Sequence, residues 1–369
     1  MKRYLILGGL GLLLGAGAQN APVTLNFYSS GDVNVRDLWE KSLIPMFERQ
    51  NPNIKINLVF SASSAAGATV DRMAAAVKAN RPSGVDLLEG PVLDAADAGL
   101  LEKLDVRKVP RLFLVETNAL ERLKYFGLPY RGSSVVLAYD SNKVKNPPRT
   151  LEALIAWIEA NPGQFTYNAP DAGGSGRAFV TRVLRIGINP QDSTLFETGY
   201  DPAKQNQWDR GLEILKRIGP KLYQGGQYSR NNAETLQFLA RGAITMGPVW
   251  SDQALSNLKQ GLLPQHIKLI QLTPPFYGGS AYVGVSKDSS NKAAGYTFLN
   301  WLMGSEAQSV VTEQMNGYPG IKLINMPADV RQKFGSIAKS YSFEFSSKFG
   351  SDMVRLWYEK VAGTPQPQR

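Results

Sequence analysis

The sequence has no cysteine and only one histidine, His266, in 369 residues. The lack of cysteine excludes disulfide frameworks, cysteine-ligated zinc or iron–sulfur centres and thiolate nucleophiles. A single histidine excludes multi-histidine metal sites, and a Ser-His-Asp hydrolase would have only His266, which has no Gly-x-Ser-x-Gly motif beside it. We therefore expect no metal and no cofactor.

Long apolar runs are also lacking, and the only candidate for a membrane segment lies at the N-terminus. Lys2 and Arg3 precede a short apolar stretch over residues 4–14, and Ala16-Gly17-Ala18 follows. The apolar part is too short to span ~30 Å of hydrocarbon, and the small residues suit signal peptidase. We predict a signal peptide over residues 1–18, cleaved after Ala18. Without cysteine a lipoprotein is excluded, so the expected location is the periplasm.

The formal charge of +10 is the feature that would raise nucleic acid as a partner. Signal cleavage removes Lys2 and Arg3 but no acid, which leaves +8. The basic residues are dispersed, and the longest basic run over residues 101–150 is Arg107-Lys108. Because clustering rather than net charge indicates polyanion binding, we expect no nucleic-acid partner.

Strand-like and helix-like periods alternate along the mature chain. Residues 23–27 and 54–60 alternate at period two, residues 70–77 follow the i, i+3, i+4, i+7 spacing of a helix, and residues 85–88 form a short apolar run. Three strand–loop–helix units predict an α/β fold with a mostly parallel sheet flanked by helices. Because single cores stop growing at roughly 250–300 residues, two lobes are expected.

The alternation of strand-like and helix-like segments continues in the second half of the chain. The extended stretch over residues 126–139 is interpreted as the first crossing between lobes, and Thr150 as the N-cap of the next helix. Further elements are predicted as a helix over 151–158, strands over 165–167, 243–246, 267–272 and 281–286, and a helix over 293–303.

Polar and aromatic residues gather in the loops at the predicted carboxyl ends of strands, where open α/β sheets bind ligands. Two lobes with such rims can face each other and hold a polar solute with hydroxyls, N–H groups, a few charges and an aromatic plane. The candidate ligand-binding residues are Tyr28, Ser30, Asp32, Ser63, Ser64, Glu89, Tyr130, Asp171, Ser175, Arg177, Trp250 and Tyr282.

Several segments resemble the bacterial extracellular solute-binding proteins of ABC importers, which have the type 2 periplasmic-binding fold. The resemblance runs in family order through nearly the whole mature chain. It lies in residues 45–48 with 51–56, 98–105, 127–130 and 147–151, and in 283–289 followed by 293–294 and 298–302.

This resemblance implies two lobes that close on a solute and a partner permease in the inner membrane. It places lobe 1 at residues 23–133 plus 274–318 and lobe 2 at 134–273. Residues 319–369 are expected to form a mostly helical segment that packs over the lobe junction. We expect a monomer that is not an enzyme.

The identity of the solute stays open among three classes. A polyamine site needs carboxylates beside aromatic faces, which Asp32, Glu89, Asp171 and Asp252 with Tyr28 and Trp250 could supply. A sugar site needs a similar aromatic plane. A small organic anion would use Arg177 at the start of the helix after Gly173-Gly174-Ser175-Gly176. Iron is disfavoured, since the family's iron binders commonly use adjacent tyrosines, which this sequence lacks.

Two other classes of protein compete with a solute-binding protein. In an exported glycoside-processing enzyme, Glu89 and Asp171 would face each other across the cleft as a catalytic carboxylate pair. Such a mechanism depends on the distance between the two carboxyl groups, which the sequence does not give. A structural or adaptor protein with an empty, degenerate cleft is the third class.

Overall fold

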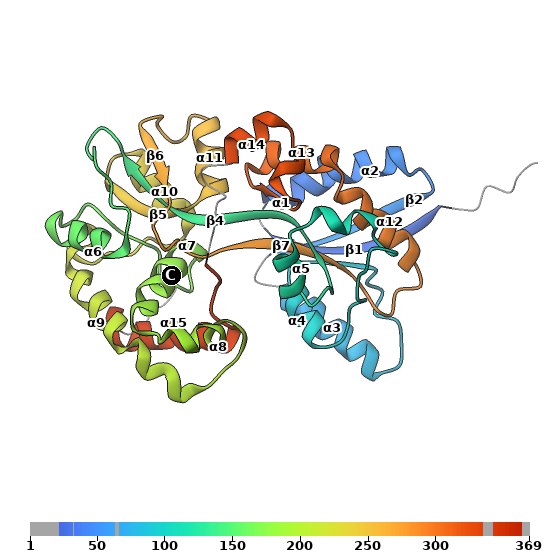
Figure 1. The fold of residues 1–369 in the computed structure, drawn as a ribbon, viewed down its shortest axis with the longest axis horizontal. Coiled ribbons are helices and arrows are strands. Elements are labelled where there is room, and N and C mark those ends of the chain that lie inside the picture. The colour runs from blue at the N-terminus through green and yellow to red at the C-terminus, as the bar shows by residue number, and fades with distance from the viewer. Residues whose placement is uncertain (1–21, 32, 63–65, 335–341, 364–369) are drawn as a thin grey trace, which may run out of the picture.

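The computed structural model describes residues 22–31, 33–62, 66–334 and 342–363. The predicted signal peptide lies outside these ranges. The described chain forms two lobes, which strands β4 and β7 connect across the middle of the molecule (Figure 1). Among the described helices, none is both long and apolar enough to span a bilayer.

The strands form one connected sheet whose main path runs β2-β1-β3-β7-β4-β5, with β6 and β8 also paired to β4. Their bounds are β1 Val23–Gly31, β2 Ile54–Ala62, β3 Leu87–Glu89, β4 Leu128–Asp140, β5 Met246–Trp250, β6 Ile267–Ile270, β7 Gly278–Val285 and β8 Tyr318–Pro319.

The first lobe is built on the parallel strands that the sequence predicts. β1 pairs in parallel with β2 and β3, and β7 runs antiparallel to β3. Leu25 and Phe27 of β1 are fully buried, as the period-two alternation predicts. Its helices are α1 Val33–Leu38, α2 Ile44–Gln50, α3 Ala66–Lys78, α4 Val92–Asp97, α5 Thr117–Arg122, α12 Lys292–Leu302 and α13 Ser305–Met315.

The second lobe differs from the expected mostly parallel sheet. β5 and β6 both run antiparallel to β4, because β4 enters from the first lobe and the chain returns beside it. In the described residues of this lobe, parallel pairing is limited to the bridges Phe165–Met246 and Asn168–Ser229. Its helices are α6 Leu151–Ala160, α7 Gly174–Leu184, α8 Ser193–Thr198, α9 Asp209–Ile218, α10 Asn232–Ala240 and α11 Ser251–Lys259. The predicted cap of α6 is confirmed, since Thr150 Oγ1 accepts from the backbone N–H of Ala153 at 3.2 Å.

Each lobe has its own aromatic core. In the first lobe the rings of Phe27 and Trp39 lie 4.8 Å apart, edge to face. In the second lobe the ring of Phe196 lies 4.5 Å from that of Phe349. Phe27, Trp39, Phe196 and Phe349 are all fully buried, so each core fixes the strands and helices of its own lobe.

The C-terminal segment divides between two locations. Helix α14 (Ala328–Phe334) stays near the junction, where Phe334 packs edge to face on Tyr318 at 5.7 Å. Helix α15 (Ser347–Trp357) instead packs into the core of the second lobe through Met353 and Trp357. This differs from the expected cover over the junction, because the apolar face of α15 is buried against the second lobe alone.

Two passages of the described chain connect the lobes. β4 pairs with β7 up to Ser134 and with β5 from Val135 onward, so the change of partner falls between these two residues. The second passage, residues 272–278, returns to the first lobe. Ser342, after α14 in the sequence, lies beside this second passage, since its N–H donates to the carbonyl of Phe276 at 3.1 Å.

A matched pair of glycines tests the backbone packing in this fold. A Cβ on Gly176 would lie 1.6 Å from the carbonyl oxygen of Asn168, whereas a Cβ on Gly67 in α3 would meet nothing within 4 Å. We expect Gly176→Ala to lower the free energy of unfolding by about 3 kcal/mol or more. Gly67→Ala should raise it by roughly 0.5–1 kcal/mol, the helical advantage of alanine. Urea unfolding measures both, and equal effects would contradict the close approach of α7 to Asn168.

Candidate functional site

Glu89, at the end of β3, is a buried carboxylate at the edge of the first lobe. Its side chain is 2% exposed, and both of its oxygens accept hydrogen bonds. Oε2 accepts from Ser29 Oγ at 2.8 Å and from the N–H of Ser30 at 3.1 Å, and Oε1 accepts from Tyr130 Oη at 3.1 Å. Burial raises the pKa of Glu89, and the nearby Arg131 charge and these hydrogen bonds oppose that rise. Glu89 therefore holds the ends of β1 and β4 together.

Arg131 follows Tyr130 in β4 and extends this chain of hydrogen bonds. Its Nε donates to Tyr130 Oη at 2.9 Å, and Tyr130 in turn donates to Glu89. Tyr130 is fully buried, and the centroid of its ring lies 4.9 Å from that of Trp39. The backbone from which the Arg131 side chain starts is therefore held in place. Burial alone would lower the pKa of the guanidinium, but its interactions with Tyr130, Glu89 and Asp252 raise it. Arg131 is half-buried and charged at the junction of the lobes.

Asp252 brings a carboxylate from the second lobe to the same junction. It lies in the first turn of α11, and its Oδ1 accepts from Ser133 Oγ at 2.7 Å. The same oxygen accepts from the N–H of Gln253 at 2.9 Å. Burial raises the pKa of Asp252, while the bond from Ser133 and the charge of Arg131 lower it. Arg131 and Asp252 therefore interact electrostatically across the lobe boundary.

Hydroxyl groups surround the point where β4 changes lobes. Ser133 Oγ lies 3.1 Å from Ser251 Oγ, and Ser134 Oγ lies 2.6 Å from Tyr318 Oη. Ser251 Oγ also donates to Tyr318 Oη at 3.3 Å. All four residues are buried. These mutually bonded hydroxyls join β4, α11 and β8 at the crossing, and Ser133 also connects them to the Asp252 carboxylate.

The Gly-rich loop before α7 is closed by two asparagines. Asn168 Oδ1 accepts from Ser175 Oγ at 2.6 Å and from the N–H of Gly176 at 2.9 Å. Asn232 Oδ1 accepts from the N–H of Ser175 at 3.1 Å. Two of the N–H groups that an anion would use, those of Ser175 and Gly176, are thus already bonded, and Ser175 is fully buried. This loop functions as an internal helix cap.

Two charged candidates of this region are paired within the second lobe. Arg177 donates from Nε to the carbonyl of Pro170 at 2.9 Å and forms an ion pair with Glu344 at 3.1 Å. Asp171 is exposed and accepts from Tyr358 Oη at 2.9 Å. The structure pairs Arg177 and Asp171 with Glu344 and Tyr358, on either side of α15, and does not bring them to Glu89.

Trp250 lies at the end of β5, against the start of α7. A Cβ on Gly174 would be 2.7 Å from Trp250 Cζ2, so the indole rests directly on the Gly174 backbone. Tyr277 packs edge to face on the indole at 6.0 Å, and its hydroxyl donates to the carbonyl of Gly174 at 2.9 Å. Trp250 is half-buried, so part of the ring remains accessible beside the junction.

The remaining predicted residues belong to the first lobe. Ser30 contributes its N–H to Glu89, as described above. Tyr28 is half-buried under the guanidinium of Arg72, 5.2 Å from the ring centroid. Tyr282 packs against the same small core as Tyr28, and its carbonyl accepts from the N–H of Gly90 at 3.4 Å. Asp32, Ser63 and Ser64 lie outside the described residues.

Sequence reasoning missed Arg131 as a site residue and left Asp252 out of the final set of candidates. A signal for Arg131 was present, because it is the one charged residue in the extended stretch over residues 126–139. Arg131 lies at the junction because β4 changes strand partners just after it, and the pattern of apolar residues does not predict that change.

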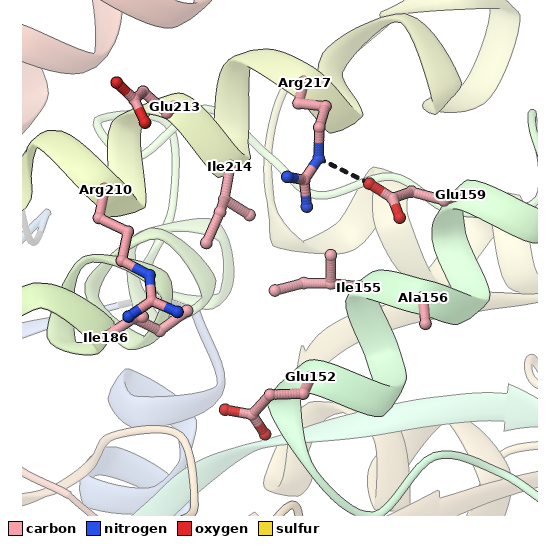
Figure 2. Close-up of a pocket in the computed structure, with 9 residues that line it drawn as sticks. All are labelled: Glu152, Ile155, Ala156, Glu159, Ile186, Arg210, Glu213, Ile214 and Arg217. Atoms are coloured by element: carbon pink, nitrogen blue, oxygen red, sulfur yellow. Dashed lines mark hydrogen bonds and ion pairs between the residues drawn. The ribbon is translucent and has the colours of Figure 1, made fainter.

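Within the described ranges, no group of three or more acidic or histidine side chains could hold a metal ion. Figure 2 shows a pocket of about 450 Å³ between α6 and α9, on the second lobe away from the junction. Glu159 and Arg217 form an ion pair at its rim at 2.7 Å. The side chains that line it are Glu152, Ile155, Ala156, Glu159, Ile186, Arg210, Glu213, Ile214 and Arg217.

The titration of Asp252 is testable through stability. Asn retains an oxygen for Ser133 and Gln253, so Asp252→Asn removes the charge and little else. Since burial raises the folded-state pKa above the ordinary 3.8, the unfolded chain loses its proton first as the pH rises. We expect the variant to gain unfolding free energy relative to wild type from about pH 4 upward until the folded group has ionised. Urea unfolding from about pH 3 to 7.5 measures this, with the exposed Asp97→Asn as control, and a difference independent of pH would contradict it.

Comparison with known proteins gives the family. Residues 42–333 match the bacterial extracellular solute-binding proteins. Protein YnjB of Escherichia coli strain K12 is 24% identical over 185 residues, which are 49% of this chain and 46% of YnjB. The match thus spans less than half the length of that relative.

Solved structures share the fold at low sequence identity. A protein from Bordetella parapertussis assigned to the extracellular solute-binding proteins aligns with a TM-score of 0.73 and 18% identity, over 92% of this chain and 98% of that one. The spermidine/putrescine substrate-binding protein PotD of Streptococcus pneumoniae gives 0.67 and 13%, over 91% and 98%. The Atu4243–GABA receptor gives 0.66 and 16%, over 94% and 100%.

These likenesses confirm the predicted α/β, two-lobed fold class. The matched family and the similar structures are solute-binding proteins rather than enzymes, which removes the alternative of a carboxylate-pair glycosidase. The family match covers more than half of the sequence, and the fold agrees with it. The chain belongs to the bacterial extracellular solute-binding proteins.

Proposed function

We propose that this protein is the solute-binding component of an ABC importer. It captures a small polar solute between its two lobes, closes around it and delivers it to an inner-membrane permease. The family supports the general role, and the two-lobed fold with strands crossing between the lobes supports the mode of capture.

One observation carries the location of the binding site. Arg131, held from the first lobe through Tyr130 and Glu89, and Asp252, on the first turn of a second-lobe helix, bring opposite charges to the same junction. Trp250 adds a partly accessible aromatic face next to it. Charged groups and an aromatic plane at a domain boundary are the usual components of a site for a small polar molecule.

The two described passages, through β4 and through residues 272–278, are proposed to form the hinge. β4 changes partners between Ser134 and Val135, which agrees with a lobe 1 of residues 23–133 plus 274–318 and a lobe 2 of 134–273. A hinge needs only a few residues at the ends of elements to absorb the change in backbone angles. The buried hydroxyls of Ser133, Ser134, Ser251 and Tyr318 lie at this point and can exchange partners at small cost.

The protein is proposed to act as a monomer in the periplasm after removal of residues 1–18. Proteins of this fold are named for spermidine and putrescine, for GABA, and for iron with citrate. That range supports a small polar solute, and a sugar, a polyamine and a small organic anion are all compatible with the general role.

Binding without turnover is the first test. Protein exported and purified from the bacterial envelope should carry its solute in native mass spectrometry, and added solute should reduce the radius of gyration in small-angle X-ray scattering. A binder gains stability as RT ln(1 + [L]/Kd) and releases the ligand chemically unchanged. A mass spectrum without bound solute, together with no ligand-dependent compaction, would contradict the proposed function.

Trp250 provides a test of the site. Trp250→Ala should weaken solute binding by about 3- to 10-fold, the value of one aromatic contact, and leave the fold intact. Isothermal titration with the solute identified above measures it. Trp157→Ala is the matched control, because Trp157 is also half-buried but lies on α6, away from the junction. Equal losses in the two variants would show that Trp250 is not part of the site.

A further inference from the structure

We infer that the solute is a small zwitterion of the amino-acid type, with its carboxylate bound by Arg131 and its ammonium group bound by Asp252. This inference rests on the proposed function and adds the chemical class of the solute. It follows from the hydrogen-bonding groups that the two side chains leave open at the lobe junction.

Arg131 has donors to spare. A guanidinium has five N–H donors, and in the described part of the chain only Nε of Arg131 has a hydrogen-bond partner, the hydroxyl of Tyr130. Among the described residues, no carboxylate oxygen lies within 4.0 Å of its nitrogens. The terminal nitrogens are not among the buried atoms that lack partners, so they face accessible space. A planar pair of such donors matches a carboxylate.

Asp252 has an acceptor to spare. Its Oδ1 is occupied by Ser133 and Gln253, whereas its Oδ2 has no hydrogen-bond partner within the described ranges. No described Lys, Arg or His nitrogen lies within 4.0 Å of this carboxylate. Oδ2 is also not a buried atom without a partner, so it too remains open to a ligand. An ammonium group on the solute would complete its hydrogen bonding.

The charges of Arg131 and Asp252 together select the chemical class of the solute. Each of them lies at a partly buried position, where a charged group with an unfilled hydrogen-bonding position is costly. A dianion would satisfy Arg131 but be repelled by Asp252, and a diamine would do the reverse. A neutral sugar would cover both charges without neutralising either. A zwitterion places an opposite charge on each, and Glu89, with both oxygens already bonded, does not compete for the ammonium group.

The arrangement also connects binding to closure. Arg131 is on the part of β4 that pairs with the first lobe, and Asp252 is on α11 of the second. A zwitterion that bridges them contacts both lobes at once and therefore favours the arrangement in which the lobes are close. Shifting an equilibrium in this way requires differential affinity, which the bridging contact supplies.

A matched panel tests the class. Thermal shift of the purified protein, stripped of bound solute by unfolding and refolding, is measured with amino acids bearing the amino group at the α to ω position, and with diamines, dicarboxylates and neutral sugars of similar size. We expect stabilisation by members of the amino-acid set alone. Stabilisation by another set would overturn this inference and leave the proposed function standing. No stabilisation by any set would overturn this inference, and an empty protein in native mass spectrometry would then contradict the proposed function as well.

Variants at the two charges test the assignment of roles with the amino acid that binds. Arg131→Met should weaken binding about a hundredfold, and Arg131→Lys, which keeps the charge but loses the planar pair of donors, about tenfold. Arg217→Met is the control. Arg217 lines the pocket between α6 and α9, away from the junction, so its substitution should not change the affinity. If Arg131→Met fails to fold, Arg131→Lys still decides, because wild-type affinity in Arg131→Lys would overturn the assignment.

Asp252→Asn tests the ammonium contact. It should weaken binding of the amino acid about tenfold but leave unchanged the affinity for the same acid without its amino group. The ratio of the two affinities is insensitive to a general structural effect of the substitution. A ratio equal to that of the wild type would overturn the role of Asp252.

Discussion

The carboxylate of Glu89 is the constraint on which the arrangement of the junction depends. A buried carboxylate is costly unless its oxygens are bonded, and here the bonds come from two elements that are distant in sequence. Ser29 and Ser30 at the end of β1, and Tyr130 in β4, all converge on it. Because breaking any of these bonds would leave a charge uncompensated, the ends of β1, β3 and β4 are held in one arrangement.

That arrangement gives Arg131 its position. Tyr130 is fixed on both sides, by Glu89 at its hydroxyl and by Trp39 at its ring, and Arg131 is bonded to the same hydroxyl. Asp252 is in turn bonded to Ser133, two residues further along β4. The positions of both charged side chains therefore depend on one strand, β4, although the two residues belong to different lobes.

Much of the fold could be predicted from local pattern, whereas the junction could not. The alternation of Leu25 and Phe27 gave β1, and Thr150 gave the start of α6, because burial on one face and a capping hydroxyl are local properties. The antiparallel pairing of β4 with β5 and β6 depends on where a strand from the other lobe enters, which no local period contains. For the same reason Arg131 appeared as one charge in an extended stretch, and α15 was expected over the junction rather than inside the second lobe.

The Gly-rich loop before α7 shows why composition misplaces an anion site. Glycines at a helix start expose N–H groups, and Arg177 beside them adds a positive charge, so the segment has the composition of an anion site. The side chains of Asn232 and Asn168 accept hydrogen bonds from two of those N–H groups, however, and Glu344 forms an ion pair with Arg177. The glycines serve packing instead, since Gly174 lets Trp250 approach and Gly176 clears the carbonyl of Asn168. Open hydrogen-bonding capacity, rather than residue type, is what distinguishes Arg131 from Arg177.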